Sequence, residues 1–428
     1  MKISDFYFHC TKISFSYRLL TASGLESTLR REVEYIYPRI KSACVASRGA
    51  VTIVDTVHPL ANLNKNLVDE FLAEITLNSR VLKGVRVKLG NNFSAKWEKQ
   101  AREALDRLPW KIFFSKTSTM PEIFVKSNNA RLFAASRVRS MVEDSFKEYQ
   151  GRTPFQQLEH LPLGSTPACS APRVFVQVEE ETFRIEIDAG GGLLNEFGFQ
   201  KFESDSRLDL AEASSAAIIL RCLSRVISNF TSETIIWDPF SGSGHLMLTA
   251  ARTLSGVPPG SPAIEYPFRM FPFHDRSVFA EKVSKLQIEP LANIDRITKL
   301  YATDSSLEAV EVMKRNLSIF TAGLPKANHT QNIIPFDIHI DRLPDAYIPP
   351  TSSDRVCLLT SLPSKGDSER KYQKFHSLIE NLRKDNRLAG CVVACSKSNM
   401  FKKLSNERWL TELRFFDGRR EVEVLSLA

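Results

Sequence analysis

The feature that most constrains the fold is a repeated alternation of apolar strands and amphipathic helices in the second half of the chain. It begins with the apolar run TIIWDPF and continues through HLMLTAARTL, KLYATD, LEAVEVMKRNLSIF, NIIPFDI, RVCLLTS, YQKFHSLIENLRK and AGCVVACS. Strands that alternate with helices in this way form parallel, doubly wound sheets. The last segment, ELRFFDGRREVEVLSLA, predicts an antiparallel hairpin turning at Asp417-Gly418. The sequence therefore predicts an α/β fold for this half.

The first half has a different order of elements. From Tyr17, a strand, a helix over GLESTLRREVEYIY and two short strands (ACVAS and GAVTIVD) predict a small α+β sheet. Further helices are expected in LVDEFLAEI, WEKQAREALDRLPW and ARLFAASRVRSMVEDSFKEYQ, and strands in GVRVKLG and EIFVKS. Residues 151–173 are rich in Pro, Ser and Gly and predict a linker, and RVFVQVEEETFRIEIDAGGG after it predicts a hairpin.

Charge is distributed unevenly between the two halves. The net charge of the 428 residues is +8. Residues 1–160 hold 25 basic and 16 acidic side chains, whereas residues 161–428 hold 32 and 33. This asymmetry favours a polyanion-binding module joined to a neutral one, with an ordinary solvated surface as the alternative. The candidate phosphate contacts are Lys126, Arg131, Arg137, Arg139 and Lys147.

Several classes of protein are disfavoured. No apolar run approaches the ~18–20 residues that span a bilayer, so we expect no membrane partner. The seven cysteines are scattered without a CxxC pair, which argues against a zinc site or a disulfide framework and favours a reducing compartment. The N-terminal segment carries Lys2, Lys12 and Arg18 but one acid, Asp5. Mitochondrial targeting is therefore a hypothesis, with a strand in a cytoplasmic protein as the alternative.

The strongest motif is Asp238-Pro239-Phe240-Ser241-Gly242-Ser243-Gly244, between an apolar strand and a helix. Its glycines allow a sharp turn and close approach of a ligand to the backbone, and the helix N-terminus offers unpaired N–H groups. The dinucleotide pattern GxGxxG is absent. A carboxylate directly after the strand would repel a pyrophosphate but can hold the cationic methionine end of S-adenosylmethionine (SAM). The motif therefore favours SAM, and Asp238, Phe240, Ser241, Gly242, Ser243 and Gly244 are the candidate cofactor-binding residues.

Two further acids extend this site. Asp304 ends the next strand, KLYATD, where a carboxylate can accept hydrogen bonds from ribose hydroxyls. Asp337 ends NIIPFD and is the candidate for the adenine amine. A single Asp at a strand end is more often a helix cap, but three at successive strand ends beside a glycine loop favour a cofactor pocket.

The order of these blocks carries a family resemblance. GLESTLRREV, LNSRVLKGVRVKLGNNF, DAGGGLLNEFGFQ, LAEASSAAIILRC and WDPFSGSG follow one another as in the THUMP-containing RNA methyltransferases, which modify the exocyclic amine of guanine. The chain most resembles the N-terminal half of the bacterial large-subunit ribosomal RNA enzyme. The resemblance implies a ferredoxin-like domain (1–70), a THUMP domain with linker (71–187) and a Rossmann-like class I methyltransferase domain (188–428). It also carries over Asp238, Gly242, Gly244, Asp304 and Asp337 as contacts to SAM.

The chain departs from the family in the catalytic motif. Active members have Asn/Asp-Pro-Pro-Tyr/Phe after their fourth strand, where the amide and a proline carbonyl hold the target amine. The segment here is Thr360-Ser361-Leu362-Pro363-Ser364, which leaves Ser361 and Pro363 as catalytic candidates and lacks the stacking ring. A second block, basic in the family, reads NEFGFQ at 195–200, and Ala211 precedes Glu212 where the family has a basic residue. Misalignment of divergent sequence is the alternative explanation.

Three hypotheses about function follow. The first is a catalytically impaired scaffold that binds ribosomal RNA and assists ribosome assembly. Its partners would include ribosomal proteins or other assembly factors, and the ribosome could be the mitochondrial one. The second is an active SAM-dependent guanine-N2 methyltransferase acting on ribosomal or transfer RNA. The third is a non-catalytic partner subunit of another enzyme, for which exposed phenylalanines in PFRMFPF would form the interface. The favoured interpretation of that segment is a loop that packs beside the cofactor cleft, as the family resemblance implies.

Overall fold

The computed structural model describes most of the chain. The described residues are 16–39, 44–54, 65–130, 133–151, 172–191, 194, 199, 210–261, 264–324, 334–343, 355–362, 368–396, 398–403 and 407–427. The basic N-terminal segment before Ser16, the candidate Arg131, most of the block 195–200, Pro363 and Ser364 lie outside them. Within the described part, none of the helices combines the length and the apolarity that crossing a membrane requires.

The first six elements form one βαββαβ unit. They are β1 (Ser16–Leu20), α1 (Glu26–Ile36), β2 (Cys44–Ser47), β3 (Ala50–Val54), α2 (Lys65–Asn78) and β4 (Gly84–Lys88). The strand order β2-β3-β1-β4 with antiparallel neighbours is the ferredoxin-like arrangement. The limit predicted between residues 70 and 71 falls inside α2 and leaves out β4. The unit continues to Lys88, because β1 needs β4 as its second hydrogen-bonded neighbour.

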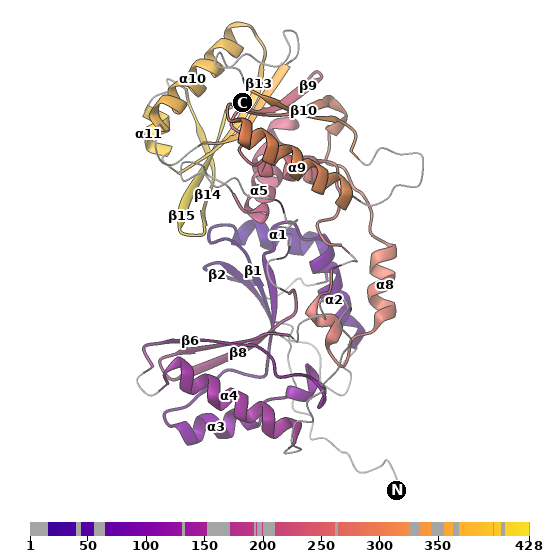
Figure 1. Ribbon diagram of the computed structural model, residues 1–428, viewed down its shortest axis with the longest axis vertical. Coiled ribbons are helices and arrows are strands. Elements are labelled where there is room, and N and C mark those ends of the chain that lie inside the picture. Colours follow the sequence, from indigo (N-terminus) through magenta and orange to yellow (C-terminus); the bar gives the residue numbers. More distant parts are fainter. Residues whose placement is uncertain are drawn as a thin grey trace.

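The next elements extend the same sheet. They are β5 (Phe93–Ser94), α3 (Glu98–Asp106), η2 (Trp110–Ile112), β6 (Ile123–Asn128), α4 (Ala135–Gln150), β7 (Val174–Glu179) and β8 (Thr182–Asp188). β7 and β8 form the expected antiparallel hairpin, and β8 also pairs with β4. The result is one eight-stranded sheet in the order β2-β3-β1-β4-β8-β7-β6, with β5 added on β8. In Figure 1, α3 and α4 lie on one side of β6 and β8.

The second half forms a separate seven-stranded sheet. Its strands are β9 (Thr234–Asp238), β10 (Ile297–Asp304), β11 (Asp337–Arg342), β12 (Arg355–Ser361), β13 (Leu388–Cys395), β14 (Leu410–Asp417) and β15 (Arg420–Leu427). The order is β11-β10-β9-β12-β13-β15-β14; the first five strands are parallel, and β15 is antiparallel to β13 and β14. The predicted doubly wound sheet and its terminal hairpin are confirmed. The helices of this half are α5 (Glu212–Ile218), η3 (Ile219–Leu223), α6 (Ser224–Ile227), α7 (His245–Leu254), η4 (Pro267–Met270), α8 (Arg276–Ser284), η5 (Ile294–Arg296), α9 (Leu307–Gly323), α10 (Ser368–Lys384) and α11 (Ser398–Lys403).

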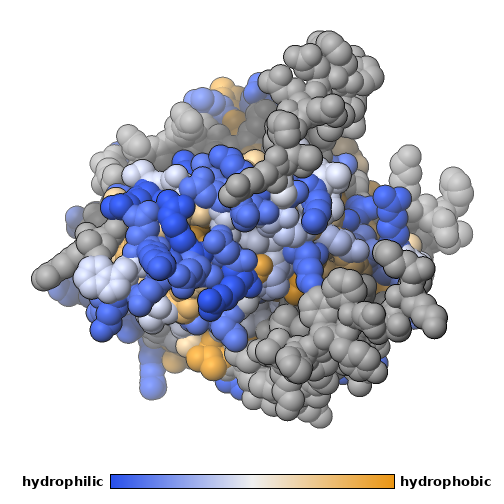
Figure 2. All heavy atoms as spheres, turned by 90° about the horizontal axis from the view of Figure 1, so that it is seen from below, coloured by the Kyte–Doolittle hydropathy of each residue, from blue (hydrophilic) through white to orange (hydrophobic). Residues whose placement is uncertain are grey.

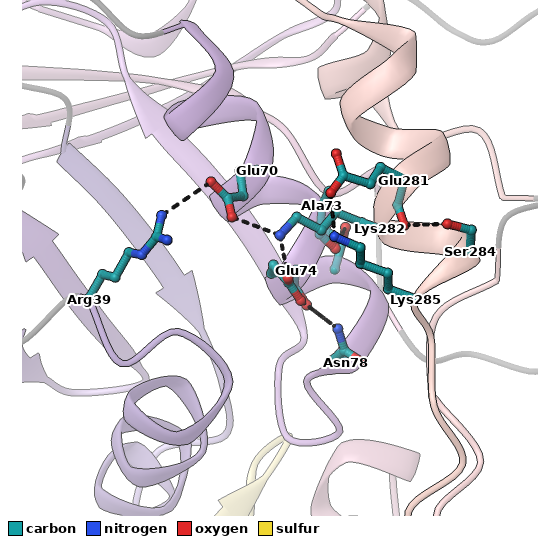
Figure 3. Close-up of polar contacts among 10 residues, drawn as sticks. Arg39, Glu70, Ala73, Glu74, Asn78, Glu281, Lys282, Ser284 and Lys285 are labelled. Atoms are coloured by element: carbon teal, nitrogen blue, oxygen red, sulfur yellow. Dashed lines mark hydrogen bonds and ion pairs between the residues drawn. The ribbon is translucent and has the colours of Figure 1, made fainter.

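Polar contacts tie the two halves together through α2 and α8, which lie side by side in Figure 1. Lys282 of α8 reaches between Glu70 and Glu74 of α2, with Nζ–Oε1 distances of 2.7 and 2.8 Å, as Figure 3 shows. Burial acts to lower the pKa of Lys282, but the hydrogen bonds to Glu70 and Glu74 outweigh it and raise the pKa. Asp69, 1% exposed, accepts a hydrogen bond from the Asp275 backbone N–H (2.8 Å), and its other oxygen lies 2.7 Å from His274 Nδ1.

The aromatic segment PFRMFPF belongs to this junction. Phe268, Phe271 and Phe273 are buried, and the rings of Phe271 and Phe273 lie 5.1 and 6.2 Å from the ring of Phe113 in the first half. The expectation of exposed phenylalanines at this segment is therefore wrong. Their apolar surface is already covered within the chain, which removes the observation that favoured a partner subunit.

We expect Asp69→Ala to lower the free energy of unfolding by about 1–3 kcal/mol, because it leaves buried donors at His274 and Asp275 without an acceptor. Urea unfolding measures the change. Glu281→Ala is the matched control, since it removes an ion pair with Lys285 that is exposed to solvent and contributes little to stability. Equal losses in the two variants would show that Asp69 does not secure the junction.

Candidate functional site

The candidate site begins where β9 meets α7. Ile235, Ile236 and Trp237 are fully buried, so the strand carries Asp238 to the carboxyl edge of the sheet with 1% exposure. The loop that follows turns at Gly242 (φ 57°) and Gly244 (φ 79°), both in the left-handed region. A Cβ on Gly244 would lie 3.0 Å from Met313 Cγ. Conformation and space therefore both require glycine at 244.

Neighbouring elements hold this loop by hydrogen bonds. Asp304, at the end of β10, accepts from the Gly242 N–H with Oδ2 (3.1 Å) and from the Ser306 N–H with Oδ1 (2.9 Å). The Ser241 N–H donates to the Thr303 carbonyl (3.0 Å), and Asn316 Nδ2 donates to the Ser243 carbonyl (2.8 Å). Asp304 thus stabilises the conformation of the loop, a role that the sequence did not predict. A contact from its remaining lone pairs to a ribose stays a prediction.

Asp238 has an unusual environment. Its Oδ1 accepts hydrogen bonds from the Phe240 N–H (3.0 Å) and from Thr360 Oγ1 (2.6 Å). Its Oδ2 is buried and has no hydrogen-bond partner among the described residues. Burial raises the pKa of Asp238 to about 7, against the effect of the hydrogen bonds from Thr360 and Phe240. An unpartnered buried carboxylate oxygen fits a cationic group such as an ammonium.

Three residues of this site escaped the sequence analysis. Thr360, fully buried at the end of β12, contacts Asp238 directly. Thr303 accepts from Trp237 Nε1 (2.9 Å), and Asn316 reaches the loop from the middle of α9. The signal for Asn316 was present, since a polar amide at a buried position of an amphipathic helix needs a hydrogen-bond partner.

The structure corrects the prediction for Asp337. That residue begins β11 and lies beside Lys299, whereas the carboxyl end of β11 lies beside Asp304. At the usual rise per residue, the register places Asp337 about 16 Å from the edge that carries Asp238 and Asp304. Its side chain is 77% exposed. Asp337 is therefore outside the site, and Asp341, paired with Thr303, is the acid of β11 nearest to it.

The catalytic candidates lie at the end of β12. Ser361 is its last residue and is half-buried. Leu362, which stands where active members have their first proline, is fully buried in a cluster with Trp237, Tyr372 and Phe375. Its backbone N–H donates to the Ala394 carbonyl (2.8 Å), a bond that proline cannot make. Leucine thus continues the sheet at this position.

Part of the altered block 195–200 also reaches the site. Phe199 is 8% exposed, and its ring lies 5.2 Å from the ring of His245, the first residue of α7. The retained aromatic residue of this block therefore packs beside the helix that follows the glycine loop.

The predicted phosphate contacts do not form one patch. Arg137, Arg139 and Lys147 are exposed on α4, and Arg137 forms an ion pair with Glu98 of α3. Figure 2 shows this end of the molecule covered mainly by hydrophilic residues. Lys126 lies on β6, on alternate positions to Ile123 and Val125, which face α4. The basic candidates are therefore divided between the helical side and the opposite side of the sheet.

Comparison with solved structures identifies the fold. SMU.472, crystallised in complex with SAH, superposes with a TM-score of 0.69 at 15% identity, over 97% of this chain and 98% of that one. TrmN from Thermus thermophilus gives a TM-score of 0.59 at 15% identity, over 96% and 98%. With the strand order described above, these matches show a class I methyltransferase fold preceded by further N-terminal domains.

Sequence comparison gives the relatives. No family model matches the chain. Curated proteins named Ribosomal RNA large subunit methyltransferase K/L match at 23% identity over 318 residues in Methylococcus capsulatus and 25% over 329 residues in Acinetobacter baumannii. These matches cover 74% and 72% of this chain but 39% of each relative, so the chain spans about two fifths of their length. The predicted resemblance to the ribosomal RNA methyltransferases is confirmed.

We expect the free energy of unfolding to fall as pH rises from about 4 to about 7, because folded Asp238 keeps a proton that the unfolded chain releases near its ordinary pKa of 3.8. The contribution is on the order of a few kcal/mol, since one pKa unit corresponds to about 1.4 kcal/mol. Urea unfolding at several pH values checks this in wild type and Asp238→Asn, whose side chain does not titrate and whose curve should be flatter.

Thr360→Val is the second variant for this measurement. It removes the hydrogen bond that favours the ionised carboxylate, so the decline in stability should extend to higher pH. Parallel curves for all three proteins would mean that Asp238 does not titrate in this range.

Proposed function

We propose that the chain is an RNA-binding, SAM-binding relative of the ribosomal RNA methyltransferases whose catalytic step is impaired, and that it acts as a scaffold in ribosome assembly. The proposal rests on the position of Leu362. Its side chain is buried in the core, at the place where active members have the first proline of the motif that holds the target amine. The K/L relatives favour ribosomal RNA as the partner. Action in mitochondria belongs to the same proposal and rests on the basic N-terminal segment alone.

The support for SAM binding comes from the residues of the site. The loop Ser241–Gly244 brings backbone close to the carboxyl ends of the strands, and Asp238 Oδ2 has no hydrogen-bond partner in the part of the chain that the structure describes. Asp238 would hold the ammonium end of the cofactor, and Asp304 would accept a hydrogen bond from the ribose. SAM supplies an electrophilic methyl group when bound. The SAH present in the structurally similar SMU.472 is consistent with such a pocket.

The support for impaired catalysis comes from β12. Methyl transfer to a guanine amine needs acceptors that position the amine and take up positive charge as it develops. Ser361 offers a hydroxyl that is shorter than an amide and turns more freely. The Leu362 N–H is engaged with Ala394, and its side chain fills the core. Neither residue can reproduce the geometry of an Asn-Pro pair.

An active enzyme is the second candidate function. The glycine loop is fully formed, and the unpartnered oxygen of Asp238 is a feature that a scaffold does not need. The two functions share the cofactor and differ in the fate of the RNA.

We expect SAM to raise the melting temperature of the wild-type chain, because a ligand that binds only the folded state stabilises it. Asp304→Ala should abolish this rise, since it removes both the ribose acceptor and the hydrogen bond that holds Gly242. Asp337→Ala is the matched control and should keep the full rise in melting temperature, because Asp337 lies at the amino end of its strand, away from the glycine loop. Thermal shift with and without SAM checks both variants.

A wild-type melting temperature that SAM leaves unchanged, confirmed by titration calorimetry on folded protein, would exclude the cofactor part of the proposal. A loss of the rise in Asp337→Ala would instead show that β11 contributes to the pocket and that the register argument fails.

For catalysis, we expect that the bound RNA contains no guanosine whose methylation requires the chain. The contacts missing at the target amine raise the activation barrier, and each 1.4 kcal/mol lowers the rate about tenfold. Mass spectrometry of RNA from cells with and without the protein measures this. Ser361→Ala should support growth and ribosome assembly as wild type does. A guanosine methylated only with the wild-type chain, and lost in Ser361→Ala, would establish the enzyme.

A further inference from the structure

The eight-stranded sheet has a face that none of the described helices covers. Along β4, β6, β7 and β8, apolar residues such as Val85, Val176 and Ile185 point into the helical core, and the alternate residues point away from it. We call this second face the outer sheet face; its members used below are Arg86, Lys88, Phe124, Lys126, Phe175 and Arg184. In Figure 1 the described helices α3 and α4 lie on the other side of these strands.

A ladder of stacked groups crosses this face. Phe124 and Phe175 are paired on neighbouring strands, and their rings stack at 5.1 Å with an interplanar angle of 15°. The guanidinium of Arg86 lies 3.5 Å from the centroid of the Phe175 ring. Because the strand order is β4-β8-β7-β6, Arg86 and Phe124 flank Phe175 from opposite sides.

The ladder ends in an exposed ring. β6 is the last strand of the sheet, so Phe124 has no neighbour beyond it among the described strands, and 38% of its surface is exposed. An aromatic ring held flat against another ring and open on its far side can accept one more planar group. A nucleic-acid base is such a group, since every base has a π-face.

The charges around the ladder favour an anion. Glu186 is 5% exposed and forms ion pairs at 3.5 Å with both Arg18 and Arg86. Lys88, Lys126 and Arg184 form no ion pair among the described residues. Burial, and then the charge of Arg184, lower the pKa of Lys88, against the effect of Glu186.

Two exposed acids border this face among the described residues: Glu179, at the carboxyl end of β7 beside Asn128, and Glu122, two positions before Phe124. Between these two acids, the charged side chains of the face that form no ion pair among the described residues are Lys88, Lys126 and Arg184, which are all basic.

We propose that the outer sheet face binds single-stranded RNA, with one base stacked on Phe124 and the adjoining phosphates held by Lys126, Arg184 and Lys88. The inference rests on the proposed RNA-binding function and adds a site on the side of the sheet opposite to α4. A base within a duplex cannot reach Phe124, because its faces are covered by its neighbours, so the site selects unpaired nucleotides. A peptide added to the edge of β6 would need neither the ring of Phe124 nor the basic side chains.

The test uses the full chain and fluorescence anisotropy with a labelled single-stranded oligouridine and a hairpin duplex. Phe124→Ala should weaken binding of the oligouridine about tenfold or more, the effect expected for loss of one base stack. Phe124→Tyr keeps a ring and should bind as wild type. Trp97→Ala is the matched control, since Trp97 is an exposed aromatic residue (63%) at the start of α3. Duplex binding should be the same in all variants.

The outcomes separate the inference from the proposed function. Wild-type binding of the oligouridine that Phe124→Ala retains in full would overturn the inference and leave the function standing. A wild-type chain that binds neither RNA would overturn both. A loss of duplex and single-strand binding together in Phe124→Ala would also overturn the site, because it would not depend on unpaired bases. Unchanged RNA binding with loss of binding to an acidic peptide would assign the face to a protein.

Discussion

The second half of the structure depends on burying two carboxylates at one edge of a parallel sheet. Asp238 and Asp304 are 1% and 2% exposed, at the ends of neighbouring strands β9 and β10. Buried charge is costly unless hydrogen bonds offset it, and the chain provides them unequally. Asp304 accepts hydrogen bonds from the backbone N–H groups of Gly242, in the glycine loop, and of Ser306, whereas one oxygen of Asp238 has no partner among the residues described. The carboxylate of Asp304 therefore stabilises the glycine loop, and the carboxylate of Asp238 can accept a contact from a cation.

The sequence was most informative where local chemistry and global fold agree. The buried run before Asp238 and the glycines after it determine a strand, a left-handed turn and a helix with little help from the rest of the chain. Strand alternation was also sufficient to predict the doubly wound sheet. The hydrogen bonds of Thr360 and Asn316 to the site were not predictable in this way, because they join elements far apart in sequence.

The failures have physical causes as well. The apolar run before Asp337 looks like a buried strand, but the strand lies after it, in DIHIDR, on the exposed edge of the sheet. An edge strand with polar residues on one face gives a weak hydropathy signal. The phenylalanines of residues 267–273 look like an interface because their partner, Phe113, belongs to the other half. The hydrophobic periodicity of the sequence also cannot reveal that β4 pairs both with β1 of the ferredoxin-like unit and with β8 of the elements that follow.

The continuity of the N-terminal sheet has a consequence for how distances are set in the molecule. The pairing of β4 with β8 joins two small units into one continuous sheet, and Asp69 and Lys282 connect that sheet to the second half. These contacts determine the separation between the N-terminal sheet and the glycine loop in the structure. Under the proposed function, an RNA that binds both the outer sheet face and the glycine loop would need a length of chain between the two contacts that matches this separation.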